Sequence, residues 1–175
     1  LLEALKTFLP ATSRSVSKEH VVETLAKTYL SGGKVDKAVQ VIRQHCHIRR
    51  LKGETAVVYA LANILLGKHN EAENILEKIA LERADRTGLH AVFLLGMSHL
   101  EQGKANEASV LFKNALRHRF KHDAMAKTYL YIGLTETEIE AGNKRNALMY
   151  CRKVSEIEAY KDYADKKREQ IRKKH

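Results

Sequence analysis

Histidine, cysteine and carboxylate side chains are the residues of this sequence that could bind a metal or act on a substrate. His118 and His122 are four positions apart, a spacing that places two imidazoles on one face of a helix. Their neighbours Arg117, Arg119 and Lys121 would repel a cation, and no third ligand follows at a spacing typical of zinc sites. The sequence therefore predicts no metal site and no cofactor.

No pattern of a nucleophile with its base is found either. Cys46 and Cys151 lie far apart in the sequence and match no C-x-x-C motif. Glu136, Glu138 and Glu140 alternate along a predicted helix, so their carboxylates fan outward instead of converging on one substrate atom. The sequence also contains no G-x-S-x-G or H-E-x-x-H motif. We therefore expect a protein that is not an enzyme and has no catalytic residue.

The composition indicates which elements hold these side chains. The chain has 175 residues, with 31 lysines and arginines against 21 aspartates and glutamates, so its formal net charge is +10. Hydrophobic residues make up 44% of the chain, enough for a packed core, and one proline with no tryptophan favours long helices over a sheet. The longest nearly apolar stretch, 55–66, is shorter than the roughly 20 residues that span a membrane, so we expect no direct membrane insertion.

The cysteines and the first residues bear on the cellular compartment. Two isolated cysteines fit reduced thiols in a cytoplasm-like compartment better than a disulfide framework, although the sequence alone leaves their pairing open. No cationic leader accompanies the apolar residues that begin at Leu1. We therefore expect a cytoplasmic location.

A pattern of glycine and alanine recurs four times along the chain. Each copy has a glycine five positions before an alanine, and the pairs are Gly33 and Ala38, Gly67 and Ala72, Gly103 and Ala108, Gly142 and Ala147. Helical apolar patterns precede and follow each glycine, so each copy predicts a helix, a tight turn and a second helix. The glycine would adopt the left-handed conformation that ends a helix, and the alanine would let the two helices approach closely. Asp36, Asn70 and Asn106 are expected to cap the second helices, and Ser17 the helix that begins at Lys18.

This pattern resembles the tetratricopeptide repeat family, whose unit has about 34 residues. The resemblance extends from Glu19 to Glu158 and includes Leu25-Ala26, Tyr59-Ala60 and Leu95-Gly96. It implies an all-α fold, an α-solenoid of antiparallel helical hairpins that wind into a right-handed superhelix. The fourth repeat is the least typical, because Glu138 stands where an apolar residue is expected.

The whole chain is then predicted as one domain of this kind. The repeats are expected at 19–52, 53–86, 89–122 and 123–158. Residues 1–10 are predicted as an amphipathic helix of a preceding or partial repeat, so the chain would begin inside a repeat. Residues 159–175 are predicted as a basic capping helix, because a terminal repeat needs a polar outer helix.

The resemblance also implies that the first helix of each repeat lines a concave groove that binds partners. Seven residues on this side are predicted to contact a partner: Lys27, Val57, Leu61, Phe93, Met97, Leu100 and Glu101. The middle of this surface is apolar, and two interpretations are open. Either something else covers it, namely a partner helix or peptide, a second copy of the chain or a further segment of the protein, or tighter packing within the chain buries it. We favour the first, a protein-protein interaction scaffold.

Positive charge gathers near the ends of the second helices. This basic edge consists of Arg49, Arg50, Lys52, Arg117, Arg119 and Lys121. Cations are favoured at helix C-termini by the helix dipole, which is sufficient to explain them. The alternative function is a basic adaptor that docks on nucleic acid or on an acidic protein surface. Only Phe120 lies nearby, so binding to nucleic acid would depend on phosphates and not on base stacking. A self-assembling module is a third hypothesis.

Overall fold

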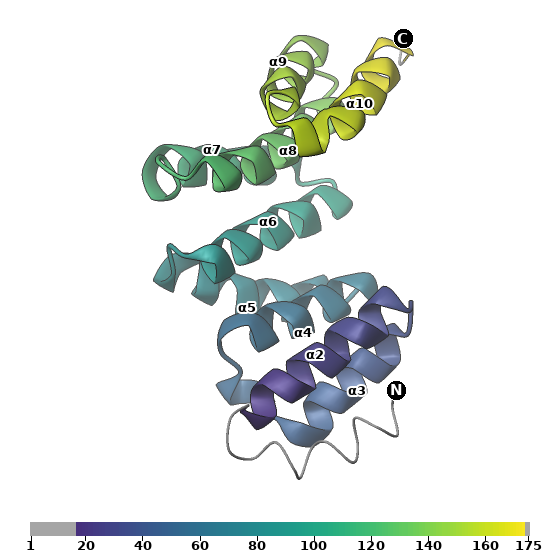
Figure 1. The fold of residues 1–175 in the computed structure, drawn as a ribbon, viewed down its shortest axis with the longest axis vertical. Helices are drawn as coiled ribbons and strands as arrows, with labels where there is room; N and C mark the ends of the chain where they lie inside the picture. The colour runs from purple at the N-terminus through teal and green to yellow at the C-terminus, as the bar shows by residue number, and fades with distance from the viewer. Residues whose placement is uncertain (1–16, 174–175) are drawn as a thin grey trace. The chain divides into compact units, whose positions relative to one another are not determined.

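The computed structural model describes residues 17–173, and every regular element in this range is a helix (Figure 1). The fold is all-α and consists of consecutive helical hairpins, as predicted. The chain divides into two compact units, with the boundary between Ile79 and Ala80. The amphipathic helix predicted for residues 1–10 lies outside the described residues.

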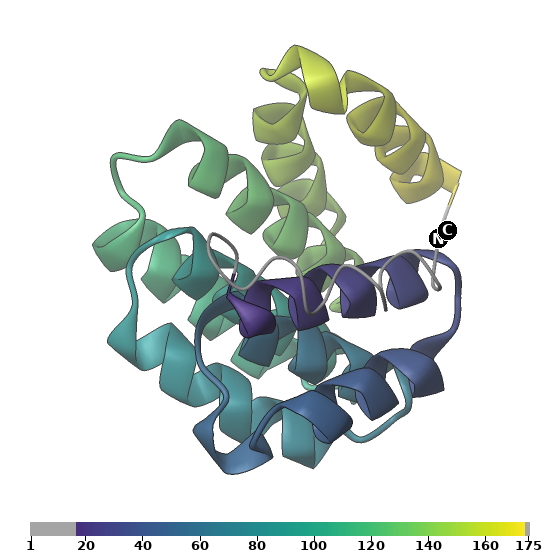
Figure 2. The same ribbon diagram turned by 60° about the horizontal axis from the view of Figure 1, so that its bottom comes forward.

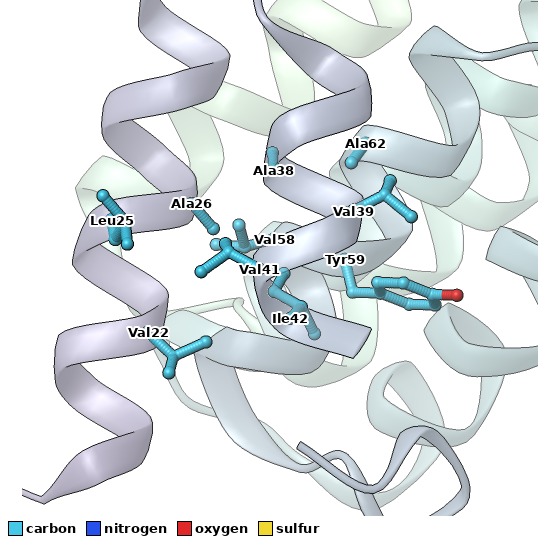
Figure 3. Packing of buried hydrophobic residues seen from close by; sticks show 10 residues of the cluster. All are labelled: Val22, Leu25, Ala26, Ala38, Val39, Val41, Ile42, Val58, Tyr59 and Ala62. Carbon is cyan, nitrogen blue, oxygen red and sulfur yellow. The ribbon is translucent and has the colours of Figure 1, made fainter. Parts of the chain in front are cut away.

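The first unit begins with a hairpin of α2 (Lys18–Ser31) and α3 (Val35–His45). A short 3-10 helix, η1 (Ile48–Arg50), leads to α4 (Gly53–Leu65), and α5 (His69–Glu82) follows. Both α2 and α3 pack against α4. Figure 3 shows the core between these three helices, and its ten buried residues are Val22, Leu25, Ala26, Ala38, Val39, Val41, Ile42, Val58, Tyr59 and Ala62.

The second unit holds two further hairpins and a final helix (Figures 1 and 2). The first of these hairpins is α6 (Arg86–Glu101) with α7 (Ala105–Asn114), which continues into a π-helical turn, η2 (Ala115–Arg119). The second is α8 (Ala124–Glu140) with α9 (Lys144–Ser155), followed by η3 (Glu158–Tyr160) and α10 (Lys161–Lys173). Helix α10 packs on α9 and buries Ala164 and Ile171. It lies within the range 159–175 for which the sequence predicts a capping helix.

The glycine turns form as the sequence predicts. The four repeat glycines have φ between 68° and 74°, the left-handed region that side chains with a Cβ rarely adopt. The four alanines that follow them are fully buried. Ser17 caps α2 and accepts a hydrogen bond from the backbone amide of His20 at 3.2 Å.

The capping role predicted for Asp36, Asn70 and Asn106 is wrong. Helices α3 and α7 begin at Val35 and Ala105, so the polar side chain is already inside the first turn in both, and no side chain caps either helix. Asn70 likewise lies within α5, which begins one residue earlier. The reason is that the left-handed glycine turns the chain so sharply that the next helix starts two residues after it. In α9 the cap is Asn143, whose side chain accepts from the amide of Asn146 at 3.3 Å.

Phe112 fills the centre of the second unit. Its ring is fully buried and touches the backbones of α6 and α8 at two glycines. A Cβ at Gly96 would lie 2.1 Å from the Phe112 ring, and a Cβ at Gly133 would lie 2.6 Å from it. Only glycine therefore fits at these two places, although glycine costs about 1 kcal/mol relative to alanine inside a helix.

Candidate protein-binding surface

In the first unit, the predicted partner-binding residues differ in exposure. Lys27 is exposed on α2, and its ammonium group lies 2.8 Å from Glu23 and 3.6 Å from Glu54. Partial burial lowers the pKa of Lys27, but the hydrogen bond and the two negative charges outweigh it, so the pKa is raised. On α4, Leu61 is half-buried and Val57 is only 3% exposed. Val57 therefore packs inside the chain and offers little surface to a partner.

In the second unit, the predicted residues all lie on α6. Phe93, Met97 and Leu100 are half-buried, and Glu101 is exposed. The Phe93 ring centroid is 6.2 Å from that of the buried Phe112 and 5.9 Å from that of Tyr129 on α8. Phe93 is thus supported from below by the core while part of its ring stays accessible.

Three aromatic rings from consecutive elements form a row on the second unit. Phe93 of α6 meets Tyr129 of α8 edge to face, and Tyr129 meets Tyr160 of η3 in the same way, with ring centroids 6.2 Å apart. All three residues are partly exposed. A hydrogen bond with Tyr129 is the main reason why the pKa of Tyr160 is raised, so the Tyr160 hydroxyl stays protonated at neutral pH. We call Phe93, Tyr129 and Tyr160 the aromatic row.

An exposed methionine extends the apolar surface beside this row. Met125 lies one helical turn before Tyr129 on α8 and is 57% exposed. Positions four apart share a helix face, so Met125 lies on the same side of α8 as Tyr129. Methionine is flexible and polarisable, and it adapts to differently shaped apolar partners.

A hydrogen-bonded group holds the end of the row in place. The Tyr163 hydroxyl on α10 donates to Oε1 of Glu136 on α8 at 2.6 Å, and the Lys167 ammonium group lies 2.8 Å from the same carboxylate. Burial raises the pKa of Tyr163, and the neighbouring Glu136 adds to this effect, so the hydroxyl remains a donor. These bonds fix α10 against α8 and thereby position Tyr160, which immediately precedes α10.

Sequence reasoning missed Tyr129 and Tyr160 as candidates for binding. Tyr129 follows Phe93 by 36 positions, which is one repeat length, so the repeat itself was the signal that could have found it. Tyr160 lies outside the four repeats, in the 3-10 turn before the capping helix. No spacing rule places it beside Tyr129, because that contact depends on how α10 packs.

The three alternating glutamates contact different elements, but they do not all point outward as the spacing predicts, because Glu138 is buried. Glu136 bonds to α10, Glu140 is exposed, and Glu138 is 5% exposed with its carboxylate 3.3 Å from the Lys113 ammonium group. They form no acid and base pair.

Burial raises the pKa of both free thiols, Cys46 and Cys151, which makes them poorer nucleophiles at neutral pH. Across residues 17–173, no three His, Cys, Asp or Glu side chains gather in a way that could hold a metal ion.

The basic edge predicted from the sequence is distributed over both units. Arg49 and Arg50 of η1, with the following Lys52, are exposed in the first unit, and Arg117 and Lys121 are exposed in the second. Arg119 is half-buried and donates to the backbone carbonyl of Leu81. Arg119 thus helps to hold its own chain together.

No helix in the described part of the chain has both the length and the apolar character needed to cross a membrane.

Comparison with known proteins gives one structural relative. No protein-family model and no curated protein sequence matches this chain. The crystal structure of a tetratricopeptide repeat protein from Parabacteroides merdae ATCC 43184 is similar to it, with a TM-score of 0.65 and 15% sequence identity. The match covers 97% of this chain and 63% of the other, so this chain spans less than two thirds of that relative. At this identity the likeness is one of fold, and it confirms the resemblance to tetratricopeptide repeats.

Proposed function

We propose that this chain is a non-catalytic protein-interaction scaffold that binds an apolar segment of a partner protein along the aromatic row. One observation carries the proposal: three rings from α6, α8 and η3 pack edge to face in a continuous row while each stays partly exposed. The likeness to a tetratricopeptide repeat protein supports a scaffold, because repeats of this kind present extended binding surfaces.

The packing of the row favours tight binding. Aromatic side chains bury large apolar areas and dominate the energetics of many interfaces. Phe93 rests on Phe112, and Tyr129 is held between Phe93 and Tyr160, so the rings keep their positions before a partner arrives. A partner therefore pays little side-chain entropy to order them. A helix or an extended peptide with apolar anchors is the ligand that such a surface fits.

Three residues of α6 complete the proposed contact surface of the second unit. Met97 and Leu100 add apolar area and Glu101 adds a polar border. The first unit, taken by itself, leaves Lys27 and Leu61 accessible as a separate candidate contact. Val57 is assigned a packing role, since its side chain is buried.

A matched pair of substitutions tests the proposal. Met125 and Val110 are 57% and 59% exposed, but Met125 lies beside the row on α8 and Val110 lies on α7. Peptides would be selected against the wild-type chain from a random phage-displayed library and then measured against M125E and V110E. We expect M125E to weaken the selected peptides at least tenfold and V110E to leave them unchanged.

The folding control is far-UV circular dichroism, which should be the same for both variants because both side chains are exposed. A third variant, Tyr129→Ala, tests the row itself. Selected peptides that bind M125E and Tyr129→Ala as tightly as the wild-type chain would exclude the row as the binding surface. A library that yields no specific peptide would argue against a peptide-binding scaffold.

A further inference from the structure

The outer face of α9 carries exposed cations on both sides of an exposed methionine. Helix α9 buries one face against its neighbours, made of Ala147, Cys151 and Val154. The opposite face presents Arg145, Met149 and Arg152, three residues spaced i, i+4 and i+7 and all exposed, with Met149 at 48%. We call these three residues the α9 stripe. It lies on the second helix of its hairpin, whereas the aromatic row includes Tyr129 of the first.

Most of the positive charge of this helix is not compensated by an ion pair within residues 17–173. The α9 sequence, KRNALMYCRKVS, has four basic residues and no acidic one. Lys153 pairs with Glu156 at 3.1 Å. Within residues 17–173, Lys144, Arg145 and Arg152 form no ion pair, so their charges are available to an external group.

Helix α10 has more basic residues, but most of them are paired. Lys167 lies 2.8 Å from Glu136, Arg168 lies 2.9 Å from Asp165, and Lys173 lies 2.6 Å from Glu169. Each of these carboxylates reduces the attraction that its cation has for a partner. Of these two basic helices, α9 is therefore the one whose charges favour an anionic ligand.

The methionine decides which kind of anion fits. A nucleic-acid backbone would neutralise the arginines but leave the central apolar side chain without a partner, and the stripe has no aromatic ring on which a base would stack. An amphipathic helix with carboxylates seven positions apart, and an apolar residue between them, matches all three side chains. Arg145 and Arg152 are separated by about 10 Å along the helix axis, which is also the separation of such carboxylates.

We propose that the α9 stripe is a second interaction surface that binds an acidic amphipathic helix of a partner protein. The two arginines attract and orient the acidic residues, and Met149 packs against the apolar residue between them. This inference goes beyond the proposed function, because the stripe and the aromatic row share no residue and each can be removed without the other.

A designed peptide tests this inference directly. The probe is a fluorescent amphipathic helix with glutamates at i and i+7 around a central leucine, and its binding to the full chain is followed by fluorescence anisotropy at low salt. We expect Arg145→Glu with Arg152→Glu to weaken binding at least tenfold. Met149→Ser should weaken it about fivefold. The matched control, Lys166→Glu with Arg172→Glu, makes the same change in net charge at two exposed positions of α10 and should change binding less than about twofold.

Several outcomes would overturn the inference. No binding of the peptide at low salt would exclude the stripe as its site. Equal losses in the two double variants would show that net charge alone attracts the peptide. A duplex RNA probe that binds more tightly than the peptide, and is unaffected by Met149→Ser, would make the stripe a phosphate-binding surface instead. Met125→Glu should leave the acidic peptide unaffected, so failure here is distinguishable from failure of the aromatic row.

Discussion

Replacing Gly133 with alanine tests how the Phe112 ring is accommodated between α6 and α8. A Cβ at position 133 would lie 2.6 Å from Cζ of Phe112 and 2.7 Å from its Cε2. Ordinary contacts between carbon atoms begin near 3.5 Å, so the ring would have to move by about 1 Å. Phe112 is fully buried, and a Cβ at Gly96 would meet the same ring even more closely, with 2.1 Å to Cζ. The ring therefore has no free space into which it can move.

Two opposing effects determine how much Gly133→Ala changes the free energy of unfolding. Overpacking a core costs about 1–3 kcal/mol, and alanine in place of glycine inside a helix gains about 1 kcal/mol. We expect Gly133→Ala to destabilise the wild-type chain by about 1 kcal/mol. In a Phe112→Leu background, the ring atoms that meet the new Cβ are absent, so the same change should stabilise by up to about 1 kcal/mol. The expected coupling energy between the two sites is then about 2 kcal/mol.

The assay is a double-mutant cycle of four proteins. Urea unfolding followed by far-UV circular dichroism gives the free energies, and hydrogen exchange of the α8 amides gives a local measure, because arrays of repeats can unfold in more than one step. A Gly133→Ala change that costs the same in both backgrounds would refute the reasoning, since the ring would then not be what excludes the Cβ. The peptides selected for the aromatic row should also bind the destabilised single variant more weakly, because Phe112 supports Phe93.

Two further predictions concern other parts of the chain. Tyr59→Phe should destabilise the first unit by about 1–2 kcal/mol in urea unfolding, because the buried hydroxyl donates to Glu71 and accepts from Arg43, both at 2.9 Å. Figure 3 shows this hydroxyl directed away from the core cluster. Unchanged stability of the variant would mean that these two hydrogen bonds contribute nothing. Hydrogen bonds from Arg83 and from a backbone amide of α6 hold the pKa of Asp85 at about 2, below its ordinary value of 3.8. The stabilising effect of Asp85 is therefore present above pH 4 and is lost as the pH falls toward 2. The difference in melting temperature between the wild-type chain and Asp85→Ala should shrink across that range, and a constant difference would contradict this prediction.

Local backbone structure is the part of this fold that the sequence predicts best. The repeat glycines predict left-handed turns, because few other residues adopt that conformation, and the alanines that follow them predict close contacts between helices. The helix starts are less predictable. Asp36 has the side chain of a cap but stands two residues too late, because the turn at Gly33 needs only Lys34 before α3 begins. N-cap propensity indicates which residue types can cap a helix, whereas the geometry of the preceding turn decides which position is the N-cap.

Exposure is harder to predict than helix position. Helix α4 is apolar nearly all round, so its sequence does not show which of its side chains stay exposed. In the structure Val57 is buried and Leu61 is half-buried. The aromatic row shows a related difficulty. Phe93 was predicted from helical spacing, but its contact with Tyr129 joins two hairpins and the contact with Tyr160 involves the capping helix. Contacts of this kind depend on packing between elements and not on periodicity within one.

The departure of the fourth hairpin from the repeat pattern has a structural explanation in Glu138. A buried carboxylate in place of an apolar residue would be strongly unfavourable alone, but Lys113 of α7 lies 3.3 Å away and Asn146 of α9 donates to it at 3.3 Å. The neighbouring Glu136 is bonded to α10. These two glutamates thus tie α8 to three other helices, and the same helix carries Tyr129 at the centre of the aromatic row. An apolar residue at position 138 would make no directional contact with α7 or α9, so these polar contacts help to fix the position of α8.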